Sequence, residues 1–212
     1  MSAPPGAIDI LITNVVSHFS MPMKIDLEKF AMNTDNCTFK NENNLHMHNS
    51  APKCFVKLTK NGSVTIMGCT SEADSQLVAF SVRLRILETM GLEDDPTSLD
   101  NFRISNVTAS SKFPFGILVD KMSNCYKEES TYEPELAPGL IWKMKEPKAT
   151  IRIYSSGNIN VMGASSENNI QDAVRNIYIF SKKFKCDPPL PQKRRRTARV
   201  NNKENTIKRK KI

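Results

Sequence analysis

The chain has 212 residues, 39% of them hydrophobic, and a formal net charge of +8, which fits one large domain or two small ones. The charge is uneven, because residues 188–212 hold ten Lys/Arg and one acid, whereas residues 1–187 hold twenty bases and twenty-one acids. These numbers exclude a body that binds phosphates by bulk charge alone. They also exclude a membrane helix, because the most apolar run, Ile8–Val16, is short and contains polar residues.

An internal repeat organises the body of the sequence. Pro52-Lys53 recurs 95 residues later as Pro147-Lys148, and this offset holds to the end of the following segment. Upstream the offset is 92 residues and relates Asn14-Val15 to Asn106-Val107, so a single loop differs in length by three residues. Further pairs at the offset of 95 are Gly62 with Gly157, Met67-Gly68 with Met162-Gly163, and Ser71-Glu72 with Ser166-Glu167. The chain therefore contains a duplicated unit.

Each unit is predicted to run in the same order of elements. It begins with a strand, over Ile8–Val16 and over Phe102–Thr108, and a short helix follows, over Ile25–Met32 and over Ile117–Met122. Two or three further strands come next, and Asn61-Gly62 and Ser156-Gly157 supply the tight turns that join the last two. A long helix closes each unit, with Ser71 and Ser166 as N-caps. Its predicted buried stripes are Leu77, Phe80, Leu84 and Leu87 in the first unit, and Ile170, Val174, Ile177 and Phe184 in the second.

The hairpin strands alternate, which predicts one buried face and one open face for the sheet. The apolar sets, expected beneath the long helices, are Cys54, Val56, Leu58, Val64 and Ile66, and Ala149, Ile151, Ile153, Ile159 and Val161. The opposite face carries Phe55, Lys57, Thr59, Thr65 and Met67, and Thr150, Arg152, Tyr154, Asn160 and Met162. Two such halves, joined edge to edge, give one continuous antiparallel α+β sheet structure with a face open to water or to a partner.

Catalytic and metal sites are not predicted. The five cysteines are an odd number without Cys-x-x-Cys pairing and are interpreted as reduced intracellular thiols. His46 and His48 could form half of a metal site, but two loop histidines are favoured because no third ligand stands at a suitable spacing. Ser17-His18 lies where the first strand is expected to end and has no evident acid partner. We therefore expect no enzyme activity, cofactor or small-molecule substrate.

The predicted boundaries are an N-terminal tail over 1–7, a first repeat over 8–92, a second repeat over 93–187 that opens with a polar hinge at 93–98, and a disordered tail over 188–212. The tail has too few apolar residues to fold alone. It carries two basic clusters, which indicate a nuclear address or a non-specific nucleic-acid arm, the alternative being a solubilising tail. The residues of these clusters are Lys193, Arg194, Arg195, Arg196, Lys208, Arg209, Lys210 and Lys211.

The run from Thr131 to Trp142, Thr-Tyr-Glu-Pro-Glu-Leu-Ala-Pro-Gly-Leu-Ile-Trp, resembles the second repeat of the TATA-binding protein family. Lys112-Phe113-Pro114-Phe115 fits the same family, and the opening run Ile8–Val16 is most similar to its TATA-binding-protein-like branch. The resemblance covers residues 8 to about 185. It implies a saddle, a curved ten-stranded antiparallel sheet with four helices on its convex side, in which apolar wedges enter the DNA minor groove and kink the duplex.

The positions of these wedges are altered here. In the family, two phenylalanines per repeat act as wedges. In this sequence the corresponding positions hold Ala137 and Tyr154 in the second repeat and Glu42 and Thr59 in the first, so that only Tyr154 could intercalate. Unstacking a base step costs about a few kcal/mol, which the other three residues cannot recover. Asn14 and Asn106 match the family's central asparagines, whereas the floor is more polar than in the family. The candidate DNA-binding residues are Asn14, Val16, Lys57, Thr65, Asn106, Thr108, Arg152, Tyr154 and Asn160.

Glu133, Glu135 and Leu136 match the second-repeat segment with which the family binds transcription factor IIB, and the family also binds transcription factor IIA. The sequence therefore favours a nuclear, TATA-binding-protein-like initiation factor for RNA polymerase II. It would be a scaffold for factors IIA and IIB with weak or absent kinking of promoter DNA. The alternative is a divergent, sequence-specific TATA binder that uses Tyr154, Lys57 and Arg152.

Overall fold

The computed structural model describes residues 8–92, 99 and 101–187. The expected N-terminal tail at 1–7, the hinge at 93–98 and the basic tail at 188–212, with its two candidate nuclear-address clusters, lie outside the described residues. Within the described ranges, no helix is both long enough and apolar enough to cross a membrane.

Ten strands form one antiparallel sheet in the order β2-β3-β4-β5-β1-β6-β11-β10-β9-β8. This order is symmetric about the β1–β6 pair, so each half contributes five strands, as the duplication predicts. The bounds are β1 (Ile10–Ser20), β2 (Cys37–Asn41), β3 (Asn44–Ser50), β4 (Lys53–Thr59), β5 (Ser63–Cys69), β6 (Arg103–Lys112), β8 (Ser130–Thr131), β9 (Leu140–Met144), β10 (Ala149–Ile153) and β11 (Asn158–Ala164). A separate pair joins β7 (Gly116–Ile117) to β12 (Lys185–Cys186).

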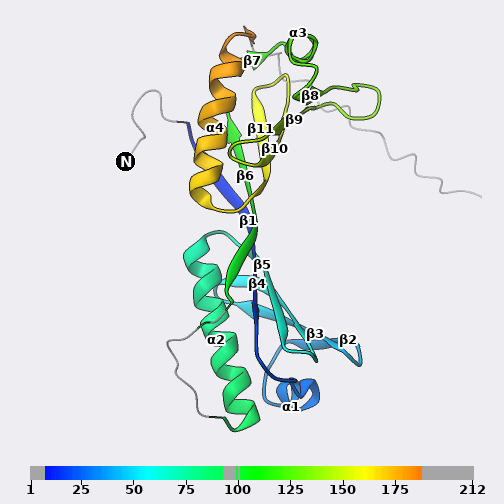
Figure 1. Cartoon of the computed structure of the whole chain (residues 1–212), viewed down its shortest axis with the longest axis vertical. Helices are drawn as coiled ribbons and strands as arrows, with labels where there is room; N and C mark the ends of the chain where they lie inside the picture. The colour runs from blue at the N-terminus through cyan, green and yellow to red at the C-terminus, as the bar shows by residue number, and fades with distance from the viewer. Residues whose placement is uncertain (1–7, 93–98, 100, 188–212) are drawn as a thin grey trace, which may run out of the picture.

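Four helices complete the fold: α1 (Leu27–Met32), α2 (Glu72–Met90), α3 (Val119–Cys125) and α4 (Glu167–Lys182). The long helix α2 packs on β5 and β1, and α4 packs on β11 and β6. Figure 1 shows α2 and α4 along one side of the sheet, while the β2–β3 hairpin and the loop between β8 and β9 project on the other side. The α+β class, the ten strands and the four helices expected from the sequence are confirmed.

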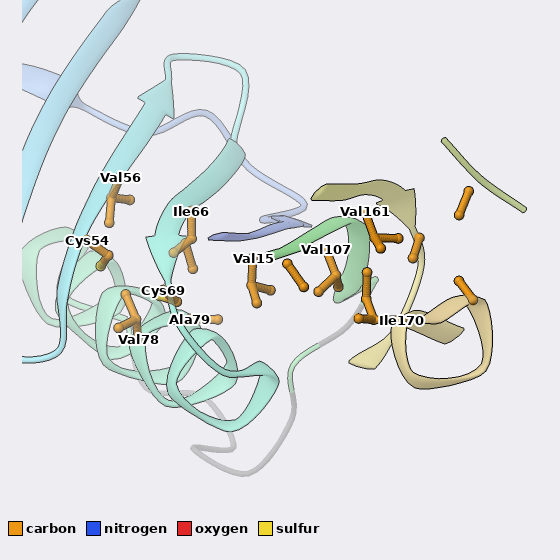
Figure 2. Close-up of a cluster of buried hydrophobic side chains, with 14 of the residues drawn as sticks. Val15, Cys54, Val56, Ile66, Cys69, Val78, Ala79, Val107, Val161 and Ile170 are labelled. Carbon is orange, nitrogen blue, oxygen red and sulfur yellow. The ribbon is translucent and has the colours of Figure 1, made fainter. Parts of the chain in front are cut away.

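The core lies between the sheet and the long helices. Figure 2 shows how Val15 and Val107, which pair across β1 and β6, lie between the two halves of this core. Every residue of the two apolar sets predicted from the alternation is buried. The glycine turns are also as predicted, because Gly62 (φ 90°) and Gly157 (φ 84°) have the positive φ that L side chains rarely adopt.

The two halves also meet through the ends of their long helices. Ser71 and Ser166 are N-caps, as predicted, and accept hydrogen bonds from the backbone N–H groups of Asp74 and Asn169. Beyond these caps, the backbone N–H of Glu72 donates to the Glu167 carboxylate at 2.7 Å, and the N–H of Glu167 donates to the Glu72 carboxylate. A carboxylate from each repeat thus accepts a hydrogen bond from the first turn of the other repeat's long helix, where a negative charge is favourable.

Several predicted bounds were too short or displaced. β1 runs on to Ser20 and β6 to Lys112, because polar residues that looked like loop, such as Ser17, are hydrogen-bonded inside the strand or the core. The second short helix begins at Val119 rather than at Ile117, which lies in β7. Four strands, rather than two or three, follow α1, since β2 is mostly exposed and shows no alternation in its sequence.

The predicted buried stripe of α2 was wrong at two of its four positions, while Leu87 is buried as predicted and Phe80 is half-buried. Leu77 is 62% exposed and Leu84 is 38% exposed, whereas the interleaved residues Val78, Val82 and Ile86 are fully buried. Both sets recur at helical spacing, so periodicity could not choose between them. In the second repeat Ile170, Val174 and Ile177 are buried as predicted, but Phe184 lies beyond the end of α4 and packs at the margin of the core.

Candidate nucleic-acid interface

The sheet face opposite α2 and α4, called the open face below, carries the candidate DNA-binding residues. Strand alternation places all nine on it, and all nine are half-buried. They form pairs related by the pseudo-twofold symmetry. Lys57 is opposite Thr65 as Arg152 is opposite Asn160, and Asn14 is opposite Thr108 as Asn106 is opposite Val16, while Tyr154 directly follows β10.

The two central asparagines are held in one orientation. The N–H of Gly68 donates to Asn14 Oδ1 at 2.7 Å, and the N–H of Gly163 donates to Asn106 Oδ1 at 2.8 Å. Because each amide oxygen accepts a hydrogen bond within the protein, the amide nitrogen is the group that each asparagine can offer to a ligand, and in Asn106 one of its two N–H groups also donates to Thr108 Oγ1 at 3.4 Å. The minor groove of a duplex presents acceptors at every A·T pair, which are the groups such donors would meet.

Arg152 and Tyr154 lie together over the backbone of Gly139. A Cβ at Gly139 would stand 2.7 Å from Arg152 Cγ and 3.1 Å from Tyr154 Cε1, so a larger residue here would displace one or both side chains. The Nε of Arg152 is buried and has no hydrogen-bond partner within the described residues. A buried donor without a partner is costly, and an arriving acceptor would satisfy it.

His18 was missed among the candidate residues, and the expectation that it lies at a strand end was wrong. It lies within β1 on the open face, where its Nε2 is 3.0 Å from Ser105 Oγ and its Nδ1 is 2.9 Å from Thr65 Oγ1. Ser105 donates its own proton to the carbonyl of Val16, so its oxygen accepts from Nε2–H. The neutral Nε2–H tautomer therefore bridges β5, β1 and β6. Alternation of Asn14, Val16 and His18 along one strand could have revealed it.

His46 and His48 were expected in a loop, and this was wrong, because both lie in β3 on the open face. The ring of Phe55 in β4 stands between them, with centroid distances of 4.7 Å to His46 and 5.2 Å to His48. The two histidines therefore flank an aromatic ring. Within the described ranges, no three His, Cys, Asp or Glu side chains gather as metal ligands would.

The local electrostatics of the open face are positive, although the body as a whole is close to neutral. Burial and the charge of Arg103 lower the pKa of His18 below 6.5. Burial, and then Lys40 and Lys57, lower the pKa of His46 in the same way. Both histidines are therefore neutral near pH 7, and the same cations would attract an anionic ligand to this face.

Three of the four positions that the resemblance matched to wedges offer no intercalating side chain. Glu42 is exposed in the turn between β2 and β3. Thr59 is tied into its own turn, where its hydroxyl donates to the carbonyl of Ser63 and accepts from the N–H of Ser63. Ala137 is short, and its N–H donates to the carbonyl of Glu133. Tyr154 remains the one large side chain among the four.

The candidate protein-binding residues Glu133, Glu135 and Leu136 lie in the loop between β8 and β9 that projects from the sheet (Figure 1). The N–H groups of Leu136 and Ala137 both donate to the carbonyl of Glu133, which closes this loop on itself. Leu136 is 81% exposed, so an apolar side chain stands free next to two acidic residues on a self-supported turn.

The chain has a duplicated ten-stranded sheet, with its long helices on one face and a polar, locally basic second face. This architecture is that of the saddle-shaped proteins. The family model described as "Transcription factor TFIID (or TATA-binding protein, TBP)" matches residues 9–90 and again residues 101–184. Each match takes one half of the sheet, and together they cover most of the sequence. The chain belongs to the TATA-binding protein family of transcription factors, and the family resemblance seen in the sequence is confirmed.

Similar proteins include both branches of the family. The Caenorhabditis elegans "TATA box-binding protein-like 1" is 40% identical over 92% of this chain, and the Dictyostelium discoideum "TATA-box-binding protein" is 31% identical over 87% of it. The solved structure of Methanococcus jannaschii TBP matches with a TM-score of 0.71 at 26% identity, covering 82% of this chain and 99% of that one. The chain spans 40% of the length of the Caenorhabditis elegans protein and 89% of the Dictyostelium discoideum protein.

Proposed function

We propose that this transcription factor acts in the nucleus as an RNA polymerase II initiation factor of the TATA-binding-protein-like kind. It is a non-enzymatic scaffold that contacts transcription factors IIA and IIB and kinks TATA duplexes weakly or not at all. The observation that carries the proposal is the loss of wedges at Glu42, Thr59 and Ala137 beside an intact, exposed turn around Leu136.

The weak-kinking part follows from an energy comparison. Each kinked step costs about a few kcal/mol of stacking, which an inserted apolar ring repays by its own burial and by the extra DNA surface that the bend brings into contact. An exposed carboxylate at Glu42 would instead be placed beside the bases and close to phosphates, which carry a negative charge like its own. Tyr154 could serve one step at most. The remaining contacts, from the two asparagine amides and from Lys57 and Arg152, can form without bending the duplex.

The bending experiment compares a TATA duplex with a matched duplex in which the A·T pairs are replaced by G·C pairs. We expect similar, weak shifts of electrophoretic mobility for both and no bend by fluorescence energy transfer between labelled DNA ends. Nanomolar, TATA-dependent bending would contradict the proposal. Such a result would favour the divergent TATA binder, which the positive surroundings of His18 and His46 also support.

A salt titration separates the two functions further. Each phosphate neutralised by the protein adds about −0.9 to the slope of log affinity against log salt concentration. The divergent TATA binder predicts a sequence-dependent affinity that falls when Lys57 or Arg152 is replaced by Gln. The scaffold predicts that these variants reduce binding equally for all sequences. The full chain and a chain ending at Asp187 are compared in both assays, because the tail is expected to supply most of the non-specific affinity.

The partner contact is tested with Leu136→Ala in a pull-down with transcription factor IIB. We expect at least a tenfold loss of captured factor, because an apolar side chain that is 81% exposed in the free protein would be buried in the complex. Leu77→Ala is the matched control, since Leu77 is similarly exposed but lies on α2 in the other half. Equal capture by both variants would contradict the assignment of this turn.

A further inference from the structure

A group of polar and thiol side chains lies inside the core of the first half. Ser17 and Ser75 are both fully buried, and their hydroxyl oxygens are 2.6 Å apart between β1 and α2. Next to them lie two cysteines, Cys54 in β4 and Cys69 at the end of β5, with exposed fractions of 6% and 1%. This group, called the thiol cluster below, contains none of the nine candidate DNA-binding residues and no residue of the projecting loop, although Cys54 lines a groove together with the open-face residues His48, Phe55 and Met67.

The second half shows what these positions need for packing alone. At the repeat offsets, Ser17 corresponds to Ala109, Cys54 to Ala149, Cys69 to Ala164 and Ser75 to Ile170, and all four are buried. The same backbone is therefore filled by apolar groups in one half and by two thiols and two hydroxyls in the other. A pair of cysteines is not required to close this part of the fold.

The two thiols lie next to one another across adjacent strands. Phe55 pairs with Met67, and at Gly68 (φ 96°) the pairing of β5 with β1 shifts by one residue, so that Cys69, rather than Gly68, faces the core on the strand next to Cys54. A Cβ at Gly68 would stand 3.7 Å from Cys54 Cα, which shows how close the strands run here. Figure 2 shows Cys54 and Cys69 on neighbouring strands above α2.

The thiols differ in acidity, and Cys54 is the one that borders a surface groove. The Cys54 thiol holds the pKa of Cys69 below its usual value, and the pKa of Cys54 is raised by the same contact and by burial. Cys54 lines a surface groove of about 510 Å³ together with Asn49, Lys53 and Gly68. Hydrogen peroxide that enters this groove would meet Cys54 first, since it is the less buried of the two residues.

We propose that Cys54 and Cys69 form an oxidation site that hydrogen peroxide converts reversibly to a disulfide. The sulfur of one thiol attacks peroxide, the O–O bond breaks, and a sulfenic acid and one water form. The sulfur of the second thiol then attacks the sulfenic sulfur, the S–S bond forms as the S–O bond breaks, and the hydroxide leaves as a second water with the thiol proton. Peroxide is reduced to two waters, and the two thiols lose two electrons and two protons.

The test uses the full chain with Cys37, Cys125 and Cys186 replaced by Ser, so that the thiol cluster holds the only cysteines. The folded, reduced protein is treated with peroxide, quenched with catalase, unfolded and alkylated with N-ethylmaleimide. We expect no alkylation and an intact mass lower by two hydrogen atoms. Tryptic digestion should then yield residues 54–57 linked to residues 61–83, and dithiothreitol should restore both alkylation sites.

The matched controls are Cys54→Ala and Cys69→Ala in the same background, which copy the residues of the second half and should keep the fold. Each should retain one thiol that is alkylated or carries oxygen after peroxide, with no loss of two hydrogen masses. Three outcomes overturn the proposal: two alkylated thiols after oxidation, sulfinic acids in place of the cross-link, or a disulfide that joins two chains.

Discussion

The two halves of the sheet share a backbone and differ in the side chains placed on it. The positions that set local geometry hold the same residue type in both halves: a turn glycine at 62 and 157, a serine cap at 71 and 166, and an asparagine at 14 and 106. The surfaces do not correspond. On the outer side of α2 Leu77 is exposed, whereas α4 carries there an ion pair between Asp172 and Arg175 at 3.4 Å. The duplicated fold constrains the turns, caps and core, and leaves each half free to acquire its own contacts.

The largest expected effect comes from the turn glycines. A Cβ at Gly62 would overlap the carbonyl oxygens of Met21 and Met23, and a Cβ at Gly157 would overlap that of Phe115. Gly62→Ala and Gly157→Ala should each lower the free energy of unfolding by about 3 kcal/mol or more, measured by urea denaturation. Gly91→Ala is the control, because Gly91 also has a positive φ but no atom within 4 Å of its added Cβ. If all three variants lose the same amount, dihedral strain alone explains the loss and the overlap argument is wrong.

The reciprocal carboxylates are expected to contribute less. Glu72→Ala and Glu167→Ala should each cost about 1 kcal/mol, because each removes a charged acceptor from a helix N-terminus in the other half. Gln76→Ala, an exposed change on α2, serves as the control. The double variant should be less destabilised than the sum of the two single variants if each substitution also frees the remaining carboxylate from its neighbour. Strict additivity would indicate that the two caps act independently.

The two central strands should differ in how they make stability depend on pH. His18 of β1 can titrate, whereas the corresponding residue of β6, Ser110, cannot. The pKa of His18 is lowered in the folded state by burial and by Arg103, so the unfolded chain binds the proton more readily. The stability contribution of neutral His18 is therefore complete above pH 6.5 and is lost as the pH falls through the lower, folded pKa. Urea midpoints at pH 7.5 and pH 5.5 should differ less for His18→Gln than for the unaltered chain. An identical pH dependence for both chains would show that His18 is not the titrating group.

The smallest effect is expected on the outer side of α2. Leu77→Ala should change the free energy of unfolding by no more than about 0.5 kcal/mol, because the side chain is 62% exposed. The neighbouring change Val78→Ala removes a buried side chain and should cost about 1–3 kcal/mol. Thermal melts of the two variants distinguish the observed facing of α2 from the stripe predicted by periodicity. A larger loss for Leu77→Ala than for Val78→Ala would indicate that the predicted stripe, and not the observed one, faces the core.

The repeat made most of the fold predictable, because two registers in one sequence require two equivalent halves. Alternation in β4, β5, β10 and β11 then identified the buried face residue by residue. Periodicity failed on α2, where Leu77 and Val78 belong to two apolar sets and only the packed sheet decides between them. Predicted domain boundaries at residues 92 and 187 stay predictions.

The candidate site was predictable in part, for a physical reason. Lys57, Arg152 and the asparagines follow from alternation and from the family resemblance. His18, His46 and His48 were noted in the sequence but not placed on this face, because their strands were assigned too short or as loop. The orientation of the asparagine amides depends on Gly68 and Gly163, which lie about 55 residues away in the chain.

The fixed orientation of Asn14 and Asn106 has a consequence for the direction in which a duplex could be bound. Two asparagine amides whose oxygens have matching partners, placed symmetrically about the junction of β1 and β6, would offer donors to either strand of a double helix in a similar way. In the proposed complex with promoter DNA, such a centre would not by itself distinguish the upstream from the downstream end. Directionality must then come from the flanks, where Phe55 and its two histidines occupy one end and Arg152 and Tyr154 the other.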